Sequence, residues 1–316
     1  FNASWAADGI DSVFTELDLR MRLSAPKLDV SRHVIVADSP PAEGVPAGTV
    51  AGFGMVIPSD DLAHDRRTYM VNLYTHPAVA TSGLDRTLMR KLVEIARENE
   101  EREETNRVGV VRLKAIPYEK QASLRALLQS CGMQEVRQFW LMHRALDEPI
   151  DEPQDVEGVI IRPYRRPEDN KPGVAAYNNS FIDHFDFHVE TEAEWEFKAN
   201  TPFFKPELSR IAEVEGTGEI AGFCICAVFD HENQATGRLQ GWISLLGTTR
   251  SWRGKGLGRS LLLHGLQALK GAGLQTAVLG VDTESLTGAN RLYESAGFHV
   301  HERTMHYECL LSEVAV

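Results

Sequence analysis

Apolar residues occur along the chain in short runs separated by glycine, proline and polar residues, and the spacing within each run distinguishes strands from helices. In the first half, this pattern predicts, in order, a helix at 12–25, strands at 32–37, 49–57 and 68–73, a helix at 83–104, a strand at 108–114 and a helix at 121–130. A Pro/Gly-rich loop is expected to join the first two strands as a hairpin.

The second half has a similar order of elements. Its pattern predicts a strand at 159–163, a helix start and turn at 170–185, a helix at 192–199, strands at 210–215, 219–229 and 241–247, a helix that begins near 257, a strand at 274–281 and a helix whose end covers 292–298. The turn signal Gly-Thr-Gly at 216–218 joins two of these strands.

The two halves also share sequence. Residues 82–96 align with 255–269, and residues 124–133 align with 289–298. We therefore expect two domains of one kind, at 1–146 and 158–316, joined by an acidic, proline-bearing connector at 147–157. A chain of 316 residues is long enough for two domains of about 150 residues each.

Charge and composition exclude several classes of function. The formal net charge of −12 argues against binding to nucleic acid or anionic membranes. No apolar run approaches the roughly 20 residues of a membrane-spanning helix, and no signal-peptide pattern is present, so we expect a cytoplasmic protein. The four cysteines have no metal-ligand spacing and are expected to be buried thiols, and no metal is expected. They are Cys131, Cys224, Cys226 and Cys309.

A glycine-rich, basic loop at 250–259 follows the strand at 241–247. Gly254, Gly256 and Gly258 lack a Cβ, so their backbone N–H groups can approach an anion closely. The start of the following helix adds unpaired N–H groups and the positive end of a helix dipole. The loop ends in neither Gly-Lys-Ser/Thr nor GxGxxG, which excludes a P-loop and the dinucleotide fingerprint. We expect it to bind the pyrophosphate of a coenzyme.

Two motifs carry a resemblance to the GNAT acyltransferase superfamily. The acetyl-CoA loop of that family, R/Q-x-x-G-x-G/A, is matched by Arg253, Gly256 and Gly258. Its LYExxGF motif is matched at 292–298. The resemblance implies two tandem α/β (α+β) GNAT domains, each a mixed, mostly antiparallel twisted sheet flanked by helices. The two-domain plan resembles that of mycothiol synthase-like enzymes.

The same resemblance implies how acetyl-CoA is held. Free backbone groups of the strand before the loop pair with the pantetheine arm, and an N–H near Leu246 polarises the thioester carbonyl. Gly247 interrupts an apolar run, as expected where a strand breaks or a ligand approaches. The implied coenzyme contacts are Leu246, Gly247, Thr248, Arg253, Gly254, Lys255, Gly256, Leu257, Gly258, Arg259 and, in place of the family's asparagine, Asn290.

Direct acyl transfer needs an acid for the leaving thiolate and a base for the amine. Tyr293, in the LYExxGF match, is the expected acid, since a phenol with a pKa of about 10 stays protonated at neutral pH. Relatives place a carboxylate on the strand before the loop, but this chain has Trp242 and Ser244 there. The base stays open among Asp183, Glu190, Glu284 and a water molecule.

The stretch 178–195 is dense in acidic, histidine and aromatic residues, and in the family this region borders the acceptor pocket. Asp183 and Glu190 are the expected substrate-binding residues. Further members of the stretch that the resemblance makes candidates are His184, Asp186, His188 and Trp195. The alternative is a segment whose aromatic rings pack on the sheet while its charges face water. A metal on His184 and His188 lacks a third ligand.

The alignment of the two halves fails at the coenzyme loop. Ala80, Thr81 and Asp85 stand where the second half has Arg253, Gly254 and Gly258, and Leu128 replaces Tyr293. A carboxylate at the anion site repels phosphate. We therefore expect the first domain to be a degenerate, structural copy.

The sequence thus predicts an N-acetyltransferase that uses acetyl-CoA, acts on an amine of a small-molecule acceptor and is active in its C-terminal domain. Two alternatives stay open. One is a catalytically silent sensor or scaffold that binds acyl-CoA, and the other is a protein or peptide N-acetyltransferase. The expected state is a monomer or a homodimer.

Overall fold

The computed structural model describes residues 1–24, 28–38, 48–61, 64–79, 82–103 and 108–315. The chain divides into two compact units. The N-terminal unit comprises residues 1–138 and 303–316, and the C-terminal unit comprises residues 139–302. The expected connector at 147–157 lies inside the C-terminal unit, and its role as a domain boundary stays a prediction.

The N-terminal unit is built on a mixed sheet with the strand order β1-β2-β3-β4-β11. All neighbouring strands are antiparallel except β3 and β4, which are parallel. The strands are β1 (Val34–Asp38), β2 (Val50–Asp61), β3 (Arg66–Thr75), β4 (Val110–Ala115) and the end of β11 (His299–Leu310).

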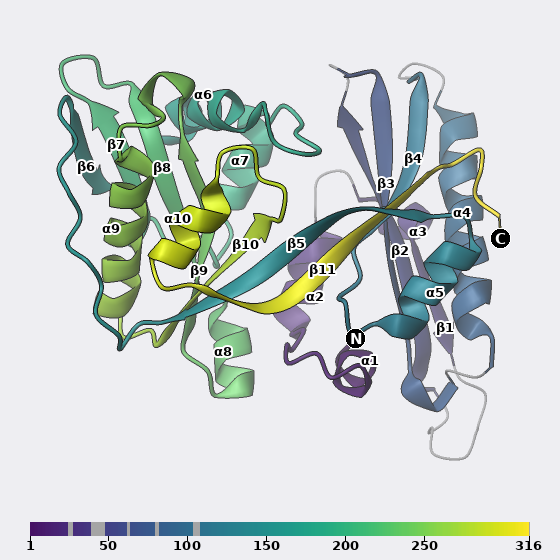
Figure 1. Ribbon diagram of the computed structural model, residues 1–316. Helices are drawn as coiled ribbons and strands as arrows, with labels where there is room; N and C mark the ends of the chain where they lie inside the picture. The colour runs from purple at the N-terminus through teal and green to yellow at the C-terminus, as the bar shows by residue number, and fades with distance from the viewer. Residues whose placement is uncertain (25–27, 39–47, 62–63, 80–81, 104–107, 316) are drawn as a thin grey trace. The chain divides into compact units, whose positions relative to one another are not determined.

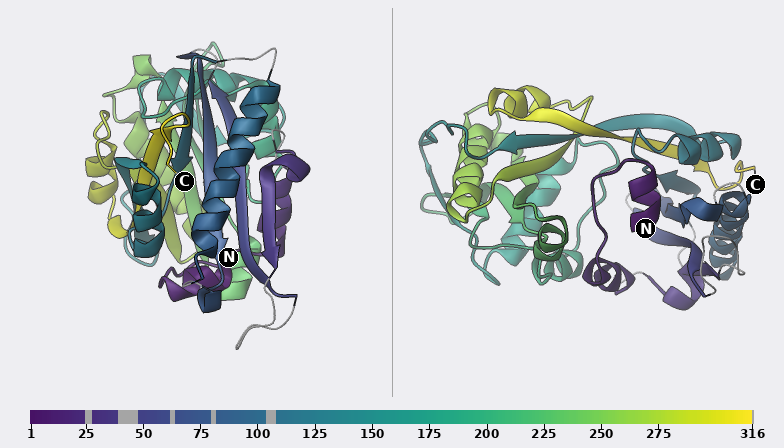
Figure 2. Two further views of the ribbon diagram at one scale, coloured as in Figure 1. Left: turned by 90° about the vertical axis from the view of Figure 1, so that its right-hand side faces the viewer. Right: turned by 90° about the horizontal axis from the view of Figure 1, so that it is seen from below.

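Helices cover this sheet and complete its core. α4 (Leu84–Arg102) packs along β2 and β3, as Figure 2 shows. The apolar residues that it buries are Leu88, Met89, Leu92, Val93 and Ala96. The core also takes residues from α5 (Ala122–Ser130) and from the end of the chain, including Tyr307. The shorter helices are α1 (Asn2–Ala7), α2 (Glu16–Leu23), α3 (Val30–His33) and η2 (Pro77–Val79).

The C-terminal unit has a second mixed sheet, with the order β5-β10-β9-β8-β7-β6 (Figure 1). Only β9 and β10 are parallel neighbours. The strands are β5 (Gln134–Ala145), β6 (Val159–Pro163), β7 (Arg210–Val214), β8 (Ile220–Ala227), β9 (Gln240–Thr248) and β10 (Thr276–Asp282).

Helices cover both faces of this sheet. Every residue of β8 is buried, and its side chains alternate between two cores. Cys224 faces α9 (Leu257–Gly271) and α10 (Ala289–Ser295), whereas Phe223 faces α6 (Asn170–Phe181) and α7 (Glu192–Ala199). Two short elements, α8 (Asp230–Thr236) and η3 (Arg250–Trp252), flank β9. The sequence predictions missed the helices α1 and α8, the strands β5 and β11, and the short elements α3, η2 and η3, and α3 overlaps the start of the strand expected at 32–37.

Several expectations can be checked against the described residues. The predicted Gly-Thr-Gly hairpin is confirmed, with positive φ at Gly216 and Gly218, whereas the loop expected at 39–47 lies outside the residues that the structure describes. The four cysteines are free thiols.

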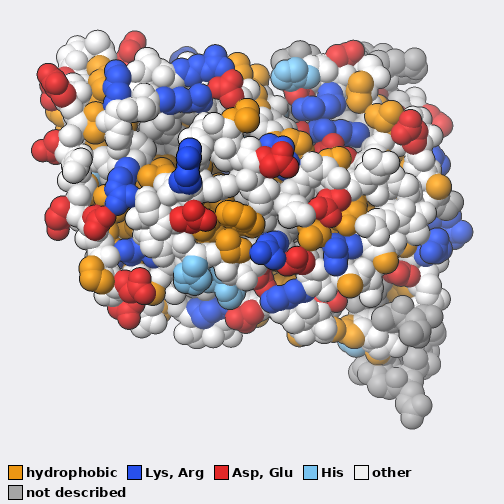
Figure 3. All heavy atoms as spheres, viewed as in Figure 1, with side chains coloured by type: hydrophobic (Ala, Val, Ile, Leu, Met, Phe, Trp, Pro, Cys, Tyr) orange, Lys and Arg blue, Asp and Glu red, His pale blue; other side chains and the backbone are white. Residues whose placement is uncertain are grey.

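Across the described ranges, no helix is long and apolar enough to cross a bilayer, and no group of three His, Cys, Asp or Glu side chains is arranged to hold a metal ion. Figure 3 shows basic and acidic side chains interspersed on the face viewed.

Candidate functional site

The central feature of the C-terminal unit is a gap between β9 and β10. The two strands pair in parallel from Thr276↔Gln240 to Val278↔Trp242, and the pairing ends there. Both strands continue, β9 to Thr248 and β10 to Asp282, while each keeps its outer neighbour. The ends of β9 and β10 therefore diverge within an otherwise continuous sheet.

The divergence leaves backbone groups of β9 facing the gap. The N–H of Thr249 donates to the carbonyl of Ala221 at 2.9 Å, and the register pairs Gly247 with Phe223. Because antiparallel residues alternate between facing their partner strand and facing away, Gly247 points its N–H toward β8. Leu246 and Thr248 consequently direct their N–H and C=O groups toward the gap, where an extended ligand can pair with them.

A bulge and a glycine shape this part of β9. The register shifts between Ile225 and Cys226, which makes Ser244 the extra, exposed residue of β9. A Cβ on Gly247 would lie 2.6 Å from the ring of Phe223 and 3.0 Å from that of Phe181. Two aromatic rings therefore require glycine here for packing, in addition to the strand break or ligand approach that the sequence predicts.

The loop after β9 has the backbone of an anion site. Gly254 and Gly256 have φ values of 74° and 83°, and no atom lies within 4 Å of the position of a Cβ at either one. Gly256 is the N-cap of α9 and gives it no side-chain hydrogen bond. The N–H of Ser260 donates to the Gly256 carbonyl at 3.1 Å, the first hydrogen bond of the α9 ladder. The N–H groups of residues 257–259, in the first turn of α9, therefore have no acceptor within the helix. Phosphate-binding helix starts have free N–H groups of this kind.

The basic side chains of the loop are held in two groups. Arg250 and Arg253 both donate to the carboxylate of Asp183, and Arg253 also donates to the Ser180 carbonyl at 2.8 Å. The N–H of Arg250 donates to Asn179 Oδ1 at 2.9 Å. The end of α6 is therefore tied to the coenzyme loop by side chains.

The second group comprises Arg259 of α9 and Lys255 of the loop. Arg259 donates to Ser295 Oγ at 2.8 Å and to Asp151 Oδ2 at 2.6 Å. Lys255 Nζ lies 4.4 Å from the ring centroid of Trp252, a cation–π distance. The basic residues predicted to contact coenzyme thus lie in the loop, as Arg253 and Lys255 do, or in the first turn of α9, as Arg259 does, and each contacts a neighbouring side chain.

Tyr293 lies on α10 within the core beneath the gap. Its ring packs edge-on against Phe298, with centroids 6.0 Å apart, and the core around it includes Ile243 of β9 and Leu261 of α9. Burial raises the pKa of Tyr293, which keeps its phenol protonated. Its hydroxyl has no hydrogen-bond partner among the described residues.

Asn290 begins the same helix one turn earlier. Its Nδ2 donates to the Thr283 carbonyl at 2.9 Å, which fixes the amide. Its Oδ1 is buried and accepts no hydrogen bond from the described part of the chain. A buried acceptor of this kind is suited to a ligand donor.

Arg144 of β5 anchors α10 at its other end. Its guanidinium donates to the carbonyls of Ala296 and Pro149, the second at 2.7 Å. Arg144 is 4% exposed, and burial lowers the pKa of its guanidinium, yet these carbonyls supply the acceptors that a buried arginine needs. The helix that carries Tyr293 and Asn290 is thereby fixed to the sheet.

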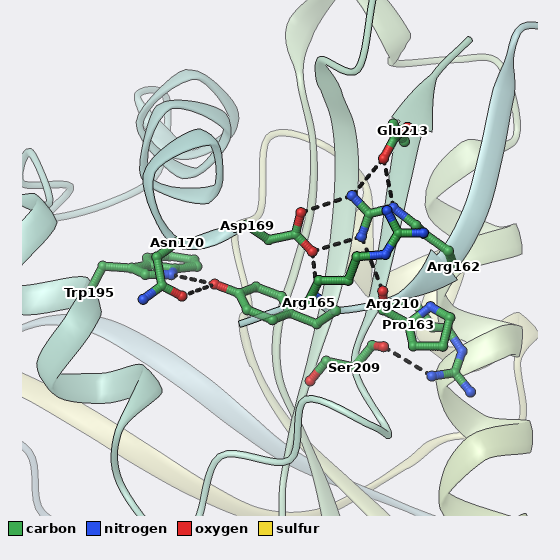
Figure 4. Close-up of polar contacts among 10 residues, drawn as sticks. Arg162, Pro163, Arg165, Asp169, Asn170, Trp195, Ser209, Arg210 and Glu213 are labelled. Atoms are coloured by element: carbon green, nitrogen blue, oxygen red, sulfur yellow. Dashed lines mark hydrogen bonds and ion pairs between the residues drawn. The ribbon is translucent and has the colours of Figure 1, made fainter. Parts of the chain in front are cut away.

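A second buried network positions α6 and α7 over the other face (Figure 4). Arg162 of β6 forms a bidentate ion pair with Asp169, in which Nη1 and Nη2 donate to the two carboxylate oxygens at 2.7 and 2.8 Å. Its Nε donates to Glu213 Oε2 of β7 at 2.6 Å. Next to it, Tyr164 accepts a hydrogen bond from Trp195 Nε1 at 3.0 Å and donates to Asn170 at 2.8 Å. Trp195 is 4% exposed, so this residue acts in packing, as the alternative in the sequence analysis holds.

Glu190 is the other predicted substrate-binding residue, and its environment is unusual. The side chain is buried, and its Oε2 pairs with Lys198 Nζ at 2.7 Å, with His188 Nε2 3.8 Å away. Asn178 holds the backbone of Glu190 through both its amide atoms. The other carboxylate oxygen, Oε1, is buried and has no hydrogen-bond partner within the ranges described.

The corresponding region of the N-terminal unit differs in its hydrogen bonds. Gly83 is the N-cap of α4 with φ 75°, which matches Gly256 at α9. Here, however, Ser82 Oγ accepts from the N–H of Leu84 at 3.3 Å, and Asp85 Oδ1 accepts from the N–H of Arg86 at 2.8 Å. Side chains of the protein itself thus occupy N–H groups at this helix start. Leu128 is buried where α10 has Tyr293, and Ala80 and Thr81 lie outside the described residues.

Comparison with known proteins places this geometry in a family. Residues 174–298 match the model of the acetyltransferase (GNAT) family. A mycothiol acetyltransferase of Streptomyces bingchenggensis is 30% identical over 280 residues, which cover 87% of this chain and 80% of that protein. One of Thermobifida fusca is 33% identical over 198 residues, which cover 59% of this chain and 61% of that protein.

Two solved structures share the fold along the chain. A GCN5-related N-acetyltransferase from Sphaerobacter thermophilus has a TM-score of 0.74 at 24% identity and covers 98% of this chain and 90% of that chain. A tandem GNAT protein from the clavulanic acid biosynthesis pathway has a TM-score of 0.67 at 15% identity, and the match covers 98% of this chain and 92% of that chain. The predicted fold class, two tandem domains with mixed sheets, is confirmed.

Proposed function

This chain belongs to the GNAT family of acetyltransferases, and from that premise we propose that it transfers an acetyl group from acetyl-CoA to an amine of a small-molecule acceptor. We place the reaction in the C-terminal unit. The observation that carries this placement is the gap between β9 and β10, which leads into the uncapped start of α9. In the N-terminal unit, the equivalent helix start is capped by Ser82 and Asp85.

The residues around the gap fit acetyl-CoA, the acyl donor that GNAT acetyltransferases use. N–H groups of the first turn of α9 would hold the pyrophosphate, with Arg253, Lys255 and Arg259 adding charge. Backbone groups of Leu246 and Thr248 would pair with the pantetheine amides. The unpartnered Oδ1 of Asn290 would accept a donor of the same arm. When bound, acetyl-CoA supplies the activated acyl group as a thioester.

Two groups of the chain would then act on the reacting atoms. The N–H of Leu246 faces the gap and would donate to the carbonyl oxygen on which negative charge develops. Tyr293, protonated because burial raises its pKa, would give its proton to the departing thiolate. A hydrogen bond with Cys224, together with burial, raises the pKa of the Cys226 thiol, so this cysteine is unsuited to form an acyl-enzyme. This chemistry favours direct transfer.

The acceptor would bind on the side of α6 and α7. Glu190 supports a cationic acceptor, because its unpartnered Oε1 needs a donor and a protonated amine supplies one. The relatives named mycothiol acetyltransferase support a small molecule as the amine. Asp183, in contrast, is occupied by two arginines, and we assign it to holding the loop.

The test combines calorimetric titration with acetyl-CoA and a turnover screen over small amines, amino sugars and peptides. One binding site per chain, with CoA released in the presence of at least one small amine, is the expected result. Binding without turnover across the screen would favour a coenzyme sensor or scaffold, and turnover with peptides alone would favour a peptide N-acetyltransferase. Absence of binding would contradict the acetyl-CoA site itself.

A further inference from the structure

Residues 181–187, here called the strap, cross the gap between β9 and β10. At one end, the ring of Phe181 lies beside Gly247 of β9. At the other end, Phe185 lies 6.5 Å, between ring centroids, from Phe139 of β5, the residue that pairs with Asp282 at the end of β10. The strap is therefore anchored to both sides of the gap.

His184 is in the middle of the strap. Its ring packs on Phe181 with centroids 4.4 Å apart, and it interacts electrostatically with Arg253 of the loop and Asp282 of β10. The imidazole thus lies near the end of β9, the end of β10 and the coenzyme loop together.

The two ring nitrogens of His184 are available to a ligand. Neither makes a hydrogen bond to a described residue, and neither is among the buried polar atoms sealed from solvent. His33 and His188, also partly or fully buried, differ, since Nδ1 of His33 accepts from the Asp29 N–H at 3.0 Å and His188 lies beside Glu190. A half-buried imidazole without an internal partner, at the mouth of a reaction site, is suited to proton transfer.

Asp183 and Glu190, the predicted acidic candidates of this stretch, are less suited to this role. Asp183 receives Arg250 and Arg253, and these hydrogen bonds lower the pKa of its carboxyl. Glu190 Oε2 is paired with Lys198. We propose that His184 is the general base that takes a proton from the acceptor amine. This inference rests on the proposed acetyl transfer.

The protons and electrons balance as follows. His184 takes one proton from the acceptor ammonium, and the nitrogen lone pair forms the bond to the acyl carbon. The C–S bond breaks, its electron pair leaves on the CoA sulfur, and the sulfur takes a proton from Tyr293. The nitrogen then loses a second proton, which reaches the tyrosinate through solvent. His184 releases to solvent the proton that it took from the ammonium.

The electrostatic surroundings keep His184 neutral before the reaction. Burial, reinforced by Arg253, lowers the pKa of the imidazole, while Asp282 and Asp183 oppose this effect. Arg250 neutralises part of the Asp183 charge, and Asp186 and His188 are the remaining ionisable groups on or beside the strap. An ordinary imidazole has a pKa of about 6.5, so His184 is deprotonated at neutral pH.

The experiment replaces the imidazole by a neutral amide. His184→Gln should lower kcat by roughly 10²- to 10⁴-fold and remove the acidic limb of the pH–rate profile, while acetyl-CoA affinity by calorimetry stays within about twofold. The matched control is His231→Gln on the exposed surface of α8, which should keep both parameters. In the unmodified protein without substrates, NMR should show the His184 imidazole titrating below about 6.5.

The outcomes separate this inference from the proposed function. If His184→Gln keeps wild-type turnover and the acidic limb, His184 is not the base, although acetyl transfer stands. An imidazole that titrates at or above its ordinary pKa would also overturn the assignment, independently of any acceptor. If the unmodified protein binds acetyl-CoA but turns over no amine, the proposed function fails and the base role fails with it.

Discussion

Asp183 Oδ2 accepts a hydrogen bond from Arg253 Nη1 at 3.0 Å, which joins the segment near the acceptor side to the coenzyme loop. The same carboxylate receives Arg250, so one acidic residue compensates two of the loop's positive charges. The loop that we assign to the pyrophosphate is thus positioned by a residue 67 and 70 positions away along the chain.

Asp183→Asn should separate binding from turnover. The amide removes the charge that holds both arginines, which remain free to meet phosphate, so the Kd of acetyl-CoA should stay within about threefold. The strap loses its ion pairs to the loop but keeps its aromatic contacts, and kcat should fall about tenfold. Calorimetry and steady-state kinetics measure the two effects. The control is Glu196→Gln on the exposed side of α7, and an equal loss of affinity and kcat in Asp183→Asn would contradict the positioning role.

Gly256→Asp should abolish acetyl-CoA binding, because it adds a negative charge and a Cβ where φ is 83°. The chain contains a matched control, Gly83→Asp, at the same N-cap position of α4 with φ 75°. This variant carries similar backbone strain but should leave coenzyme affinity unchanged. Calorimetric titration checks both. Loss of binding in Gly83→Asp would show that the N-terminal unit also contributes a site.

Tyr293→Phe should lower kcat about 10- to 1000-fold with little change in acetyl-CoA affinity. The hydroxyl has no partner among the described residues, so its loss should leave the free energy of unfolding nearly unchanged. Tyr164→Phe makes the matched comparison, because the Tyr164 hydroxyl bonds Trp195 and Asn170 and its removal should cost about 1–2 kcal/mol. Wild-type turnover in Tyr293→Phe would leave that tyrosine with a packing role alone.

Acid should destabilise the fold through buried histidines. Burial is the main cause that lowers the pKa of His33, and its Nδ1 must stay unprotonated to accept from the Asp29 N–H. The unfolded state therefore binds more protons, so stability is full above about pH 6.5 and declines as the pH falls through the lower, folded pKa. Urea unfolding at several pH values measures this.

His33→Asn should reduce the pH dependence of unfolding while lowering stability at neutral pH. The slope should not vanish, because burial also lowers the pKa of His184 and His264. His231→Gln on the surface provides the comparison. A His33→Asn slope equal to that of the unmodified protein would show that this imidazole does not couple to folding.

Local sequence signals predicted much of this molecule. β6 and α7 have the ends that the pattern predicts, because each is a regular run with clear boundaries. Gly254 and Gly256 of the coenzyme loop have positive φ, whereas Gly258 lies in the first turn of α9. The GNAT fold in two copies is confirmed. These features depend on residues that are neighbours in the sequence.

Long-range relationships escaped prediction. β5 mixes polar, aromatic and apolar residues without a two-residue period, so its sequence gives no strand signal. It forms a strand because it pairs with β10, which is more than 130 residues away along the chain. The need for glycine at 247 comes from the rings of Phe181 and Phe223, which only the fold brings there. The pairing of Asp183 with the loop arginines has the same origin. The catalytic and binding roles of these residues remain predictions.

The last strand also bears on how the protein is made. β11 begins in the C-terminal unit, but its end pairs with β4, and Met305, Tyr307, Leu311 and Val314 complete the core of the N-terminal unit. During synthesis, the N-terminal unit can therefore complete its sheet and its core only after residues 305–314 have been made. The C-terminal unit, continuous in sequence, is complete earlier, so the half that is synthesised first is the half that finishes folding last.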